Sequence, residues 1–397
     1  MCGPSRSAAA ALGPPSTGRR AEIVRTASDL IRQRGYGGVA MKDVADALGV
    51  TAPSLYRHFP SKQALLSAAI SDGFEVAEAA AAEGERAGLD ALIRALAEAA
   101  VDQRNLWVLV HRESRHLDRA TRATMSRRLD GLVAKISGTI RSRWPDADSS
   151  DADMLARAAL AALSAPSQYR QKLPKGRLRV ELAEAANRVV RVDFSSKAPG
   201  ATPSLRHSPL FNPELSRRES ILAAAANLFA RRGYQDVTVG DIGAAVSIAG
   251  PSIYNHFRGK PEILACVLWR SLDWIESDMA SAVATHDSTE GALLQLYCDY
   301  TDLAVHNPEM FEVFSVEGVH LPAFDRSRIR RAHNAFVDRW VALLRSAQPG
   351  LGLGDARARV TASLCIINDV GRLIPRDDES VDGCEKLVLL ALAAAGL

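Results

Sequence analysis

Apolar positions recur along nearly the whole chain at the spacing of one face of an α-helix. Near the start of this pattern Ile23, Ala27, Leu30 and Ile31 follow the i, i+4, i+7, i+8 order, and stretches rich in Ala, Leu and Arg continue it to about residue 192. No stretch shows the regular alternation that predicts a β-strand. The pattern therefore predicts an all-α protein.

One part of this helical pattern occurs twice. Residues 20–66 recur without a gap about 198 positions later as residues 218–264, and a fainter match continues into the helices that follow. A period of this length is too long for a solenoid repeat and indicates two fused copies of a whole domain. The identical pairs include Ile23/Ile221, Leu30/Leu228, Gly35/Gly233, Tyr36/Tyr234, Asp43/Asp241, Pro53/Pro251, Ser54/Ser252, Tyr56/Tyr254, His58/His256, Phe59/Phe257, Lys62/Lys260 and Leu66/Leu264.

Each repeated segment predicts three short helices and the start of a longer one. The first helix ends at Gly35, because glycine readily takes the left-handed conformation that closes a helix. The second helix, around residues 41–48, stops at Gly49, and Thr51 caps a third helix that carries Pro53 in its first turn. Two short helices joined by a tight turn form a helix-turn-helix, whose second helix enters the major groove of DNA.

Composition narrows the setting of this motif. The chain has 397 residues, of which 47% are hydrophobic and 24% charged, which is typical of a soluble protein of two or three domains. The net charge of +3 is small, but residues 19–62 hold an excess of about four positive charges, which either meet phosphates or form a solvated helix face. Five scattered cysteines without a CxxC pair fit the reducing cytoplasm, and no apolar run approaches the roughly 18 residues of a membrane span.

The three-helix pattern resembles the TetR family of bacterial transcriptional regulators, over about 47 residues in each copy. The resemblance implies binding of double-stranded operator DNA, and a larger helical domain that binds a small ligand and pairs two subunits through its last two helices. It implies no cofactor. The residues that carry the resemblance are Gly35-Tyr36, Val44-Ala45, Leu48-Gly49-Val50, Leu55-Tyr56-Arg57-His58-Phe59 and Ser61-Lys62.

The repeat and the resemblance together predict a tandem of two TetR-like units. A tail rich in Gly and Pro precedes them, and a linker rich in Pro, Ser and Gly joins them. The expected segments are a disordered tail 1–18, a first helix-turn-helix domain 19–66, a first helical ligand or dimerisation domain 67–192, a linker 193–215, a second helix-turn-helix domain 216–264 and a second helical domain 265–397. The apolar last helices of the two units are expected to pack against each other as an intramolecular pseudo-dimer, although two whole chains could associate through the same helices.

Family resemblance and side-chain chemistry assign the expected DNA contacts. The positions that hold the phosphate backbone or brace the third helix in the family are Tyr56, His58 and Lys62, with Tyr254, His256 and Lys260; for the two tyrosines, packing with the hydroxyl at the rim is the alternative. Exposed positions of the third helix, which read bases, are Thr51, Ala52, Pro53, Ser54 and Arg57 in the first copy and Ala249, Gly250, Pro251, Ser252 and Asn255 in the second. Arginine favours guanine and asparagine favours adenine, so we expect an operator of two unlike half-sites, an imperfect palindrome.

The second copy departs from the first at two places. Thr238 and Asp241 predict a capped second helix, whereas Ala40 at the matching position of the first copy lacks the cap, worth about 1 kcal/mol. Ser247 stands where the family usually has glycine in the turn, and Gly243 where it usually has alanine. Serine tolerates a positive φ poorly, so we expect a strained or altered turn.

Side chains on the later helices predict a ligand cavity, a small lipophilic molecule being the expected effector. The candidates are Trp107, His111 and His116 in the first unit, with Tyr297, Tyr300, Phe311, Phe314 and His320 in the second. An aromatic stripe also fits an ordinary core. Glu113 and His116 repeat as Glu317 and His320; without a third or fourth ligand in view, this spacing predicts an ion pair or a helix-end hydrogen bond rather than a metal site.

Two other classes of function compete with a regulator. The sequence contains no GxSxG elbow, HExxH pair or Walker loop, so we do not expect an enzyme. The other alternative is a regulator or interaction module in which only the first helix-turn-helix binds DNA and the chain dimerises. Whether the outcome is repression or activation is open in the sequence, and repression is the habit of the family.

Overall fold

The computed structural model describes residues 18–195, 211–375 and 380–397, and these residues form helices and no strands, as predicted. Residues 18–195 are the first half of the molecule and residues 211–397 the second half. The α-helices of the first half are α1 (Arg19–Arg34), α2 (Met41–Ala47), α3 (Ala52–Tyr56), α4 (Lys62–Arg86), α5 (Leu89–Asp102), α6 (Leu106–Val108), α7 (Arg119–Arg143), α8 (Ser149–Leu163), α9 (Ala165–Gln168) and α10 (Lys175–Val189). Those of the second half are α11 (Arg217–Arg232), α12 (Val239–Ala245), α13 (Lys260–Thr285), α14 (Thr289–His306), α15 (Pro308–Val316), α16 (Ala323–Ala347), α17 (Leu353–Val370) and α18 (Ser380–Ala395).

Five short helical turns complete the described secondary structure: η1 (Leu109–Glu113), a π-helix, and the 3-10 helices η2 (Ser114–His116), η3 (Gly250–Asn255), η4 (Glu317–His320) and η5 (Gly371–Leu373). The predicted tail falls outside the described residues except for Gly18, and α1 begins at Arg19. Most of the predicted linker, residues 196–210, also falls outside them.

The first three helices of each half fold as the sequence predicts. We call residues 19–62 the first head and residues 217–260 the second head. Gly35 closes α1 with a φ of 74°, and its counterpart Gly233 closes α11 with a φ of 83°. The apolar side chains at and just after the third helix are fully buried, at 2% exposure or less: Leu55, Phe59, Ile253 and Phe257.

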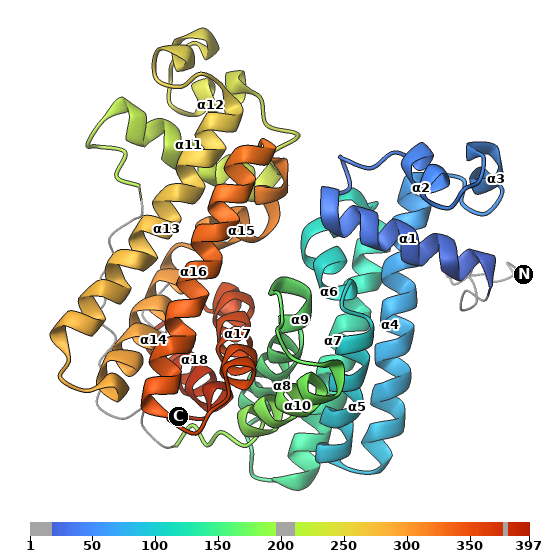
Figure 1. The fold of residues 1–397 in the computed structure, drawn as a ribbon, viewed down its shortest axis with the longest axis vertical. Helices are drawn as coiled ribbons and strands as arrows, with labels where there is room; N and C mark the ends of the chain where they lie inside the picture. The colour runs from blue at the N-terminus through green and yellow to red at the C-terminus, as the bar shows by residue number, and fades with distance from the viewer. Residues whose placement is uncertain (1–17, 196–210, 376–379) are drawn as a thin grey trace, which may run out of the picture.

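Each head is joined to its half by a continuous helix. The predicted boundary at residue 66 falls inside α4, which runs from Lys62 to Arg86, and the boundary at residue 264 falls inside α13. A head is therefore rigidly continued into the helical body of its half. Both heads lie at the same end of the molecule (Figure 1).

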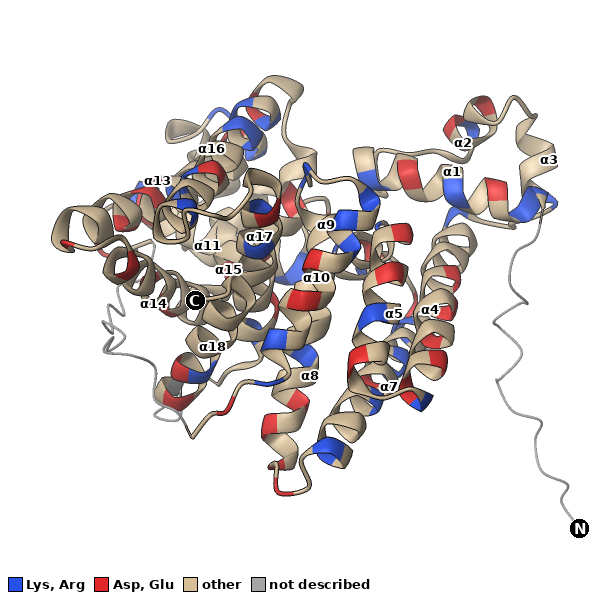
Figure 2. Cartoon of the chain, turned by 60° about the horizontal axis from the view of Figure 1, so that its bottom comes forward, with Lys and Arg blue, Asp and Glu red and all other residues tan. Residues whose placement is uncertain are grey.

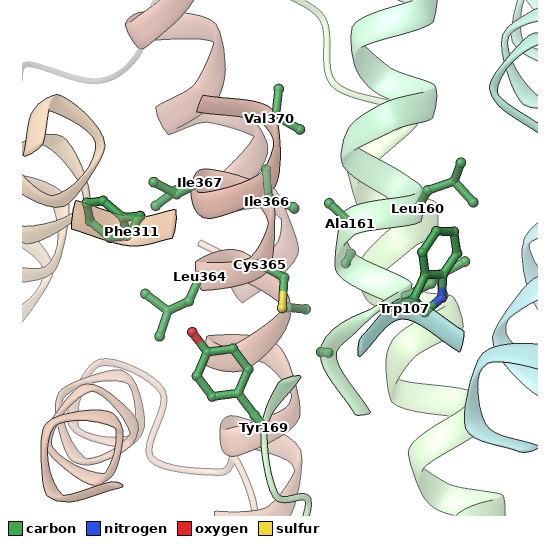
Figure 3. Close-up of a cluster of buried hydrophobic side chains, with 14 of the residues drawn as sticks. Trp107, Leu160, Ala161, Tyr169, Phe311, Leu364, Cys365, Ile366, Ile367 and Val370 are labelled. Carbon is green, nitrogen blue, oxygen red and sulfur yellow. The ribbon is translucent and has the colours of Figure 1, made fainter. Parts of the chain in front are cut away.

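The last two long helices of the two halves pack together at the centre of the molecule. Helices α8 and α10 of the first half contact α17 and α18 of the second, as predicted from their apolar composition (Figure 1). Figure 3 shows Ala161 of α8 on the side that faces Ile366 of α17, whereas Leu160 points the other way, toward Trp107. The four helices of this bundle thus belong to one chain, and their apolar faces are buried between the halves.

Polar bonds also cross this central interface. Arg188 donates from Nε to Ala393 O at 2.8 Å and from Nη2 to Ala394 O at 2.9 Å, which satisfies carbonyls at the end of α18. Arg359 donates to the buried Glu181 at 3.2 Å. Further ion pairs join the halves, among them Arg177 with Asp355 and Lys386 with Asp151, and Figure 2 shows charged positions on the central helices as well as on the outer ones.

Candidate nucleic-acid interface and effector cavity

The third helix of the first head presents its predicted base-reading side chains to solvent. Arg57 and Thr51 are exposed, and Tyr56 has half of its surface exposed. Thr51 occupies the N-cap position but its side chain makes no capping hydrogen bond, so the predicted cap is wrong. Its hydroxyl is therefore not committed to the helix.

The second helix of the first head is half capped. Ala40 has no side-chain acceptor, as predicted, yet Asp43 accepts a hydrogen bond from Ala40 N at 2.6 Å. In the second head both halves of the capping box form, because Thr238 Oγ1 also accepts from Asp241 N at 3.1 Å. Hydrogen bonds from Thr238 and Arg232 lower the pKa of Asp241 to about 2.

The lysine at the start of each long helix points inward. Lys62 Nζ donates to Tyr36 O at 2.8 Å and to Val39 O at 2.9 Å, and it lies 4.0 Å from the centre of the Tyr36 ring. Lys260 repeats this arrangement with Tyr234. Of the two roles that the family resemblance allowed, this geometry favours a brace of the head over a phosphate contact.

Arginines at the start of each head also act as braces. Arg20 donates to His58 O at 3.2 Å, with its guanidinium 4.3 Å from the centre of the Phe59 ring. Arg218 makes the same contacts in the second head, with His256 O and with the Phe257 ring. Some cations of the heads therefore stabilise the fold. Fewer of them are free to contact phosphates than the positive charge of residues 19–62 suggests.

The turn of the second head has the strain that its sequence predicted. Ser247 has a φ of 58° and is the one residue other than glycine with a positive φ among the described residues. The helix that follows is the 3-10 helix η3 rather than an α-helix. A methyl group on Gly243 would lie 2.9 Å from Ile248 O, so glycine here lets η3 lie close against α12.

The two reading surfaces differ in charge as well as in shape. The segment 41–57 of the first head carries the exposed cations Lys42 and Arg57, whereas the matching segment 239–255 of the second head contains no Lys or Arg. Asn255 and Tyr254 are exposed on the second surface. Binding at the second surface would depend on hydrogen bonds more than on phosphate attraction.

The Glu-x-x-His pair of the first half ties that half to the first head. Glu113 is 2% exposed; it accepts from Arg112 Nε at 2.5 Å and from Tyr36 N at 3.1 Å. His116 stacks on the Tyr36 ring with centroids 4.6 Å apart. The carboxylate of Glu113 is thus paired with Arg112; His116 Nε2 lies 3.7 Å from it, and burial lowers the pKa of His116, which disfavours the predicted ion pair between the two.

The pair of the second half is completed by the first half. Glu317 is 1% exposed and forms a two-bond ion pair with Arg115, whose own counterpart in the second half is Val319. His320 stacks on Tyr234 with centroids 5.4 Å apart. Burial and the nearby positive charge of Arg115 lower the pKa of His320 to about 4, so the ring is neutral at pH 7.

The two heads meet across this junction. Val319 of the second half lies against Gly35 of the first head, at 3.2 Å from the position of a methyl group there. Arg115 lies against Gly233 of the second head in the same way, at 2.8 Å, and Gln235 approaches Gly37. Each half therefore contacts the head of the other.

One cavity of about 290 Å³ lies between the halves. It includes five of the predicted ligand residues: Trp107, His111, Tyr300, Phe311 and Phe314. The other three are elsewhere, because His116 and His320 stack at the head junction and Tyr297 packs on Trp340 in the core, with ring centroids 4.7 Å apart. Figure 3 shows Trp107 of the first half and Phe311 of the second within the apolar cluster between the halves.

Polar residues of the cavity were not predicted from the sequence. They are Arg32, Arg112, Ser167, Gln168, Ser271, Ser315, His333, Asn368 and Arg372. Burial lowers the pKa of His333 to about 4, so this ring adds no charge at pH 7. One of these polar residues could have been singled out by aligning the two copies. Arg112 and Arg115 align with Val316 and Val319, so only the first copy has arginines at these two positions.

Comparison with known proteins agrees with the two heads. The model of the bacterial regulatory proteins of the tetR family matches residues 23–69 and again residues 221–267. The chain has two TetR-type heads in tandem.

The similar proteins are regulators of transcription. The TetR-type chain is 29% identical over 152 residues to the HTH-type transcriptional repressor KstR2 of Mycolicibacterium smegmatis, an alignment that covers 38% of this chain and 72% of the relative. It is 26% identical over 171 residues to the transcriptional activator FasR of the same species, covering 43% of this chain and 77% of the relative. The solved structure of the ketosteroid transcriptional regulator KstR2 of Mycobacterium tuberculosis aligns with a TM-score of 0.40 and 24% identity, over 46% of this chain and 94% of that chain.

The two matches to the family model and the regulators among the relatives support a DNA-binding transcriptional regulator. Within the described residues, no helix has the length and apolar character of a membrane span.

Proposed function

We propose that this TetR tandem binds a single asymmetric operator as an intramolecular pseudo-dimer. One observation carries the proposal: two heads with different reading residues lie at the same end of one chain. Arg57 of the first head favours guanine, and Asn255 of the second favours adenine. The operator is therefore an imperfect palindrome whose half-sites are about one helical turn apart, or a multiple of it.

The junction between the halves supports pairing within the chain. Arg115 neutralises the buried Glu317, and Val319 gives the second half no cation for that purpose. Two second halves paired with each other would bury two such carboxylates without a partner, which costs several kcal/mol. Light scattering at micromolar concentration would then give the mass of one chain, and a mass of two chains would contradict this arrangement.

We propose repression with release by a small lipophilic effector. The aromatic wall of the cavity between the halves supports the lipophilic character, and the repressor KstR2 among the relatives supports the direction of the response. The effector favours a spacing of the two heads that no longer fits the groove, which is a shift between two populations. The activator FasR is the reason to measure the direction of the response in a reporter strain.

The decisive experiment is a selection from random DNA, followed by binding measurements on the selected site. Arg57→Ala and Asn255→Ala should each weaken binding by about 1 to 3 kcal/mol, and each should relax the choice of base in a different half-site. Recovery of a perfect palindrome, or of no site, would sink the proposal. Binding to the DNA that flanks the gene is a second source of candidate sites.

A second function remains open because of the strained turn of the second head. Ser247 has a positive φ, and no Lys or Arg lies between residues 239 and 255. If only the first head binds DNA, two chains must combine to read a palindrome. Arg57→Ala would then abolish binding, Asn255→Ala would leave it unchanged, and the bound complex would contain two chains.

A further inference from the structure

The wall of the cavity between the halves contains three arginines and, among the described residues, no carboxylate. Arg372 is already engaged, since it donates to Glu312 at 2.6 Å and to Asp369 at 3.1 Å. Arg112 is engaged as well, with Glu113 at 2.5 Å, and can bind an anion only by giving up a present bond, whereas Arg32 Nε has no hydrogen-bond partner. The cavity therefore combines apolar rings with two guanidinium groups at one side.

Arg32 is the less engaged of the two. Its Nε is buried and has no hydrogen-bond partner, and its Nη2 is 3.9 Å from Asp29, which is long for an ion pair. A buried donor without an acceptor is costly, and an anion in the cavity would satisfy it. Arg32 lies in the last turn of α1, so a molecule bound to it touches the first head directly.

Arg112 connects the cavity to the end of the same helix. Its Nε is held by Glu113 at 2.5 Å, and its Nη2 donates to Ile31 O at 2.8 Å and to Arg32 O at 2.9 Å. A guanidinium binds a carboxylate with two donors along either of two edges, and both edges include Nη2. A carboxylate bound in this way must take a donor from the carbonyls that end α1.

We infer that the cavity binds one compact apolar molecule with a carboxylate group, and that this molecule acts through the first head. Its apolar part packs on Trp107, Phe311 and Phe314, and its carboxylate binds Arg32 and Arg112. A volume of about 290 Å³ lies at the low end of the roughly 300 to 1,000 Å³ of ligand pockets, which limits the size of the molecule. This inference deepens the proposed function and rests on it.

The response is one-sided because the halves differ. The counterpart of Arg112 is Val316, which cannot hold the end of α11 through a guanidinium. No residue of the second head belongs to the described wall of the cavity, whereas Arg32 of the first head does. The carboxylate therefore loosens α1 and leaves the second head in place.

Calorimetric titration of the full chain tests the site without DNA. The probes are straight-chain carboxylates from butyrate to decanoate and phenylacetate, each beside its methyl ester. We expect one carboxylate to bind per chain. The methyl ester should bind at least about tenfold more weakly, because it has no charged oxygen to accept hydrogen bonds from the guanidinium groups. Two molecules per chain, equal binding of acid and ester, or no binding in the whole series would overturn the inference.

Three variants separate the two arginines from general charge effects. Arg32→Gln and Arg112→Gln should each weaken carboxylate binding by about tenfold or more. Arg141→Gln, at the exposed end of α7, is the matched control and should leave binding unchanged. Within the described residues the side chain of Arg32 makes no hydrogen bond, so its variant stays informative if loss of Arg112 impairs folding. Unchanged binding by Arg32→Gln would contradict the assignment.

Hydrogen exchange and footprinting test the one-sided response. The tightest carboxylate should speed amide exchange at residues 31–36 and leave residues 229–234 unchanged. On a selected operator it should weaken protection of the half-site that depends on Arg57 and spare the half-site that depends on Asn255. Equal responses of both heads would overturn the one-sided mechanism. Absence of any DNA binding would instead contradict the proposed function, and calorimetry would still decide the site.

Discussion

At the scale of single residues, Lys62 shows how a cation present in both copies can stabilise the fold rather than contact DNA. Its ammonium group bonds Tyr36 O and Val39 O and lies over the Tyr36 ring, and this burial lowers its pKa. Sequence reasoning placed it at the phosphate backbone or at the brace of the helix. Only the folded elbow between α1 and α2 places two carbonyls within its reach.

Lys62→Met should therefore act on stability and not on DNA attraction. Loss of a charged donor to two carbonyls should lower the free energy of unfolding by about 2 to 3 kcal/mol. The salt dependence of DNA binding should stay the same. Lys42→Met, at an exposed position of the first head, is the matched control: it should lower the salt slope by about 0.9 and leave stability within about 0.5 kcal/mol. A smaller salt slope for Lys62→Met would instead support a contact between Lys62 and a DNA phosphate.

Ser247 is the second residue whose conformation decides a prediction. Its φ of 58° costs a residue with a Cβ about 1 kcal/mol, so Ser247→Gly should raise the free energy of unfolding by about that amount. Gly49→Ser makes the reverse change at the matching turn of the first head, where φ is 64°, and should lower it by a similar amount. Thermal unfolding of both variants measures the effect. A destabilised Ser247→Gly would show that the serine side chain has a use of its own.

At the scale of elements, the third helix of each head differs although the sequences align without a gap. The first copy forms the α-helix α3 and the second forms the 3-10 helix η3. Gly243 and Gly250 allow η3 to approach α12 more closely than side chains would permit. The two reading surfaces therefore differ in backbone shape as well as in side chains.

Gly243→Ala tests this close packing. The added methyl group would lie 2.9 Å from Ile248 O and 3.1 Å from Gly250 Cα, and such overpacking costs about 1 to 3 kcal/mol. Binding at the second half-site should weaken, while the first half-site stays occupied. Gly138→Ala in α7 is the control, since its methyl group meets nothing within 4 Å and should stabilise the helix by up to about 1 kcal/mol. Unchanged stability of Gly243→Ala would mean that η3 is free to move away.

At the scale of the whole molecule, the two halves complement each other at the junction of the heads. Arg115 crosses to Glu317, and Val319 crosses to Gly35. The pseudo-symmetry of the fold thus contains a chemical asymmetry, with the cation on one side and the buried carboxylate on the other. A fused chain keeps these different surfaces together at a fixed stoichiometry.

Arg115→Met should leave Glu317 buried without a cation and lower the free energy of unfolding by about 3 kcal/mol. The double variant Arg115→Met with Glu317→Gln should recover much of this loss, because no uncompensated charge remains. Arg339→Met, which removes an exposed pair with Glu276, is the control and should cost less than about 1 kcal/mol. Equal instability of the single and double variants, measured by thermal unfolding, would show that packing and not charge holds the junction.

The sequence by itself determined the helical class, the duplication and the capping box of Thr238 and Asp241, because these follow from local signals, whereas the predicted Thr51 cap does not form. Periodic apolar residues predict helices, Gly35 closes one, and Thr238 with Asp241 begins another. Such signals depend on neighbours a few residues apart, so they can be recognised along the chain.

Only the tertiary structure decided what those elements meet. Lys62 bonds carbonyls 23 and 26 residues away, and Arg115 meets a carboxylate 202 residues away. The wall of the cavity comes from both halves, so Trp107 and Phe311 both line it. His116 and His320 instead stack on tyrosines of the two heads. Contacts of this kind depend on how helices pack in space, which a period along the chain does not encode.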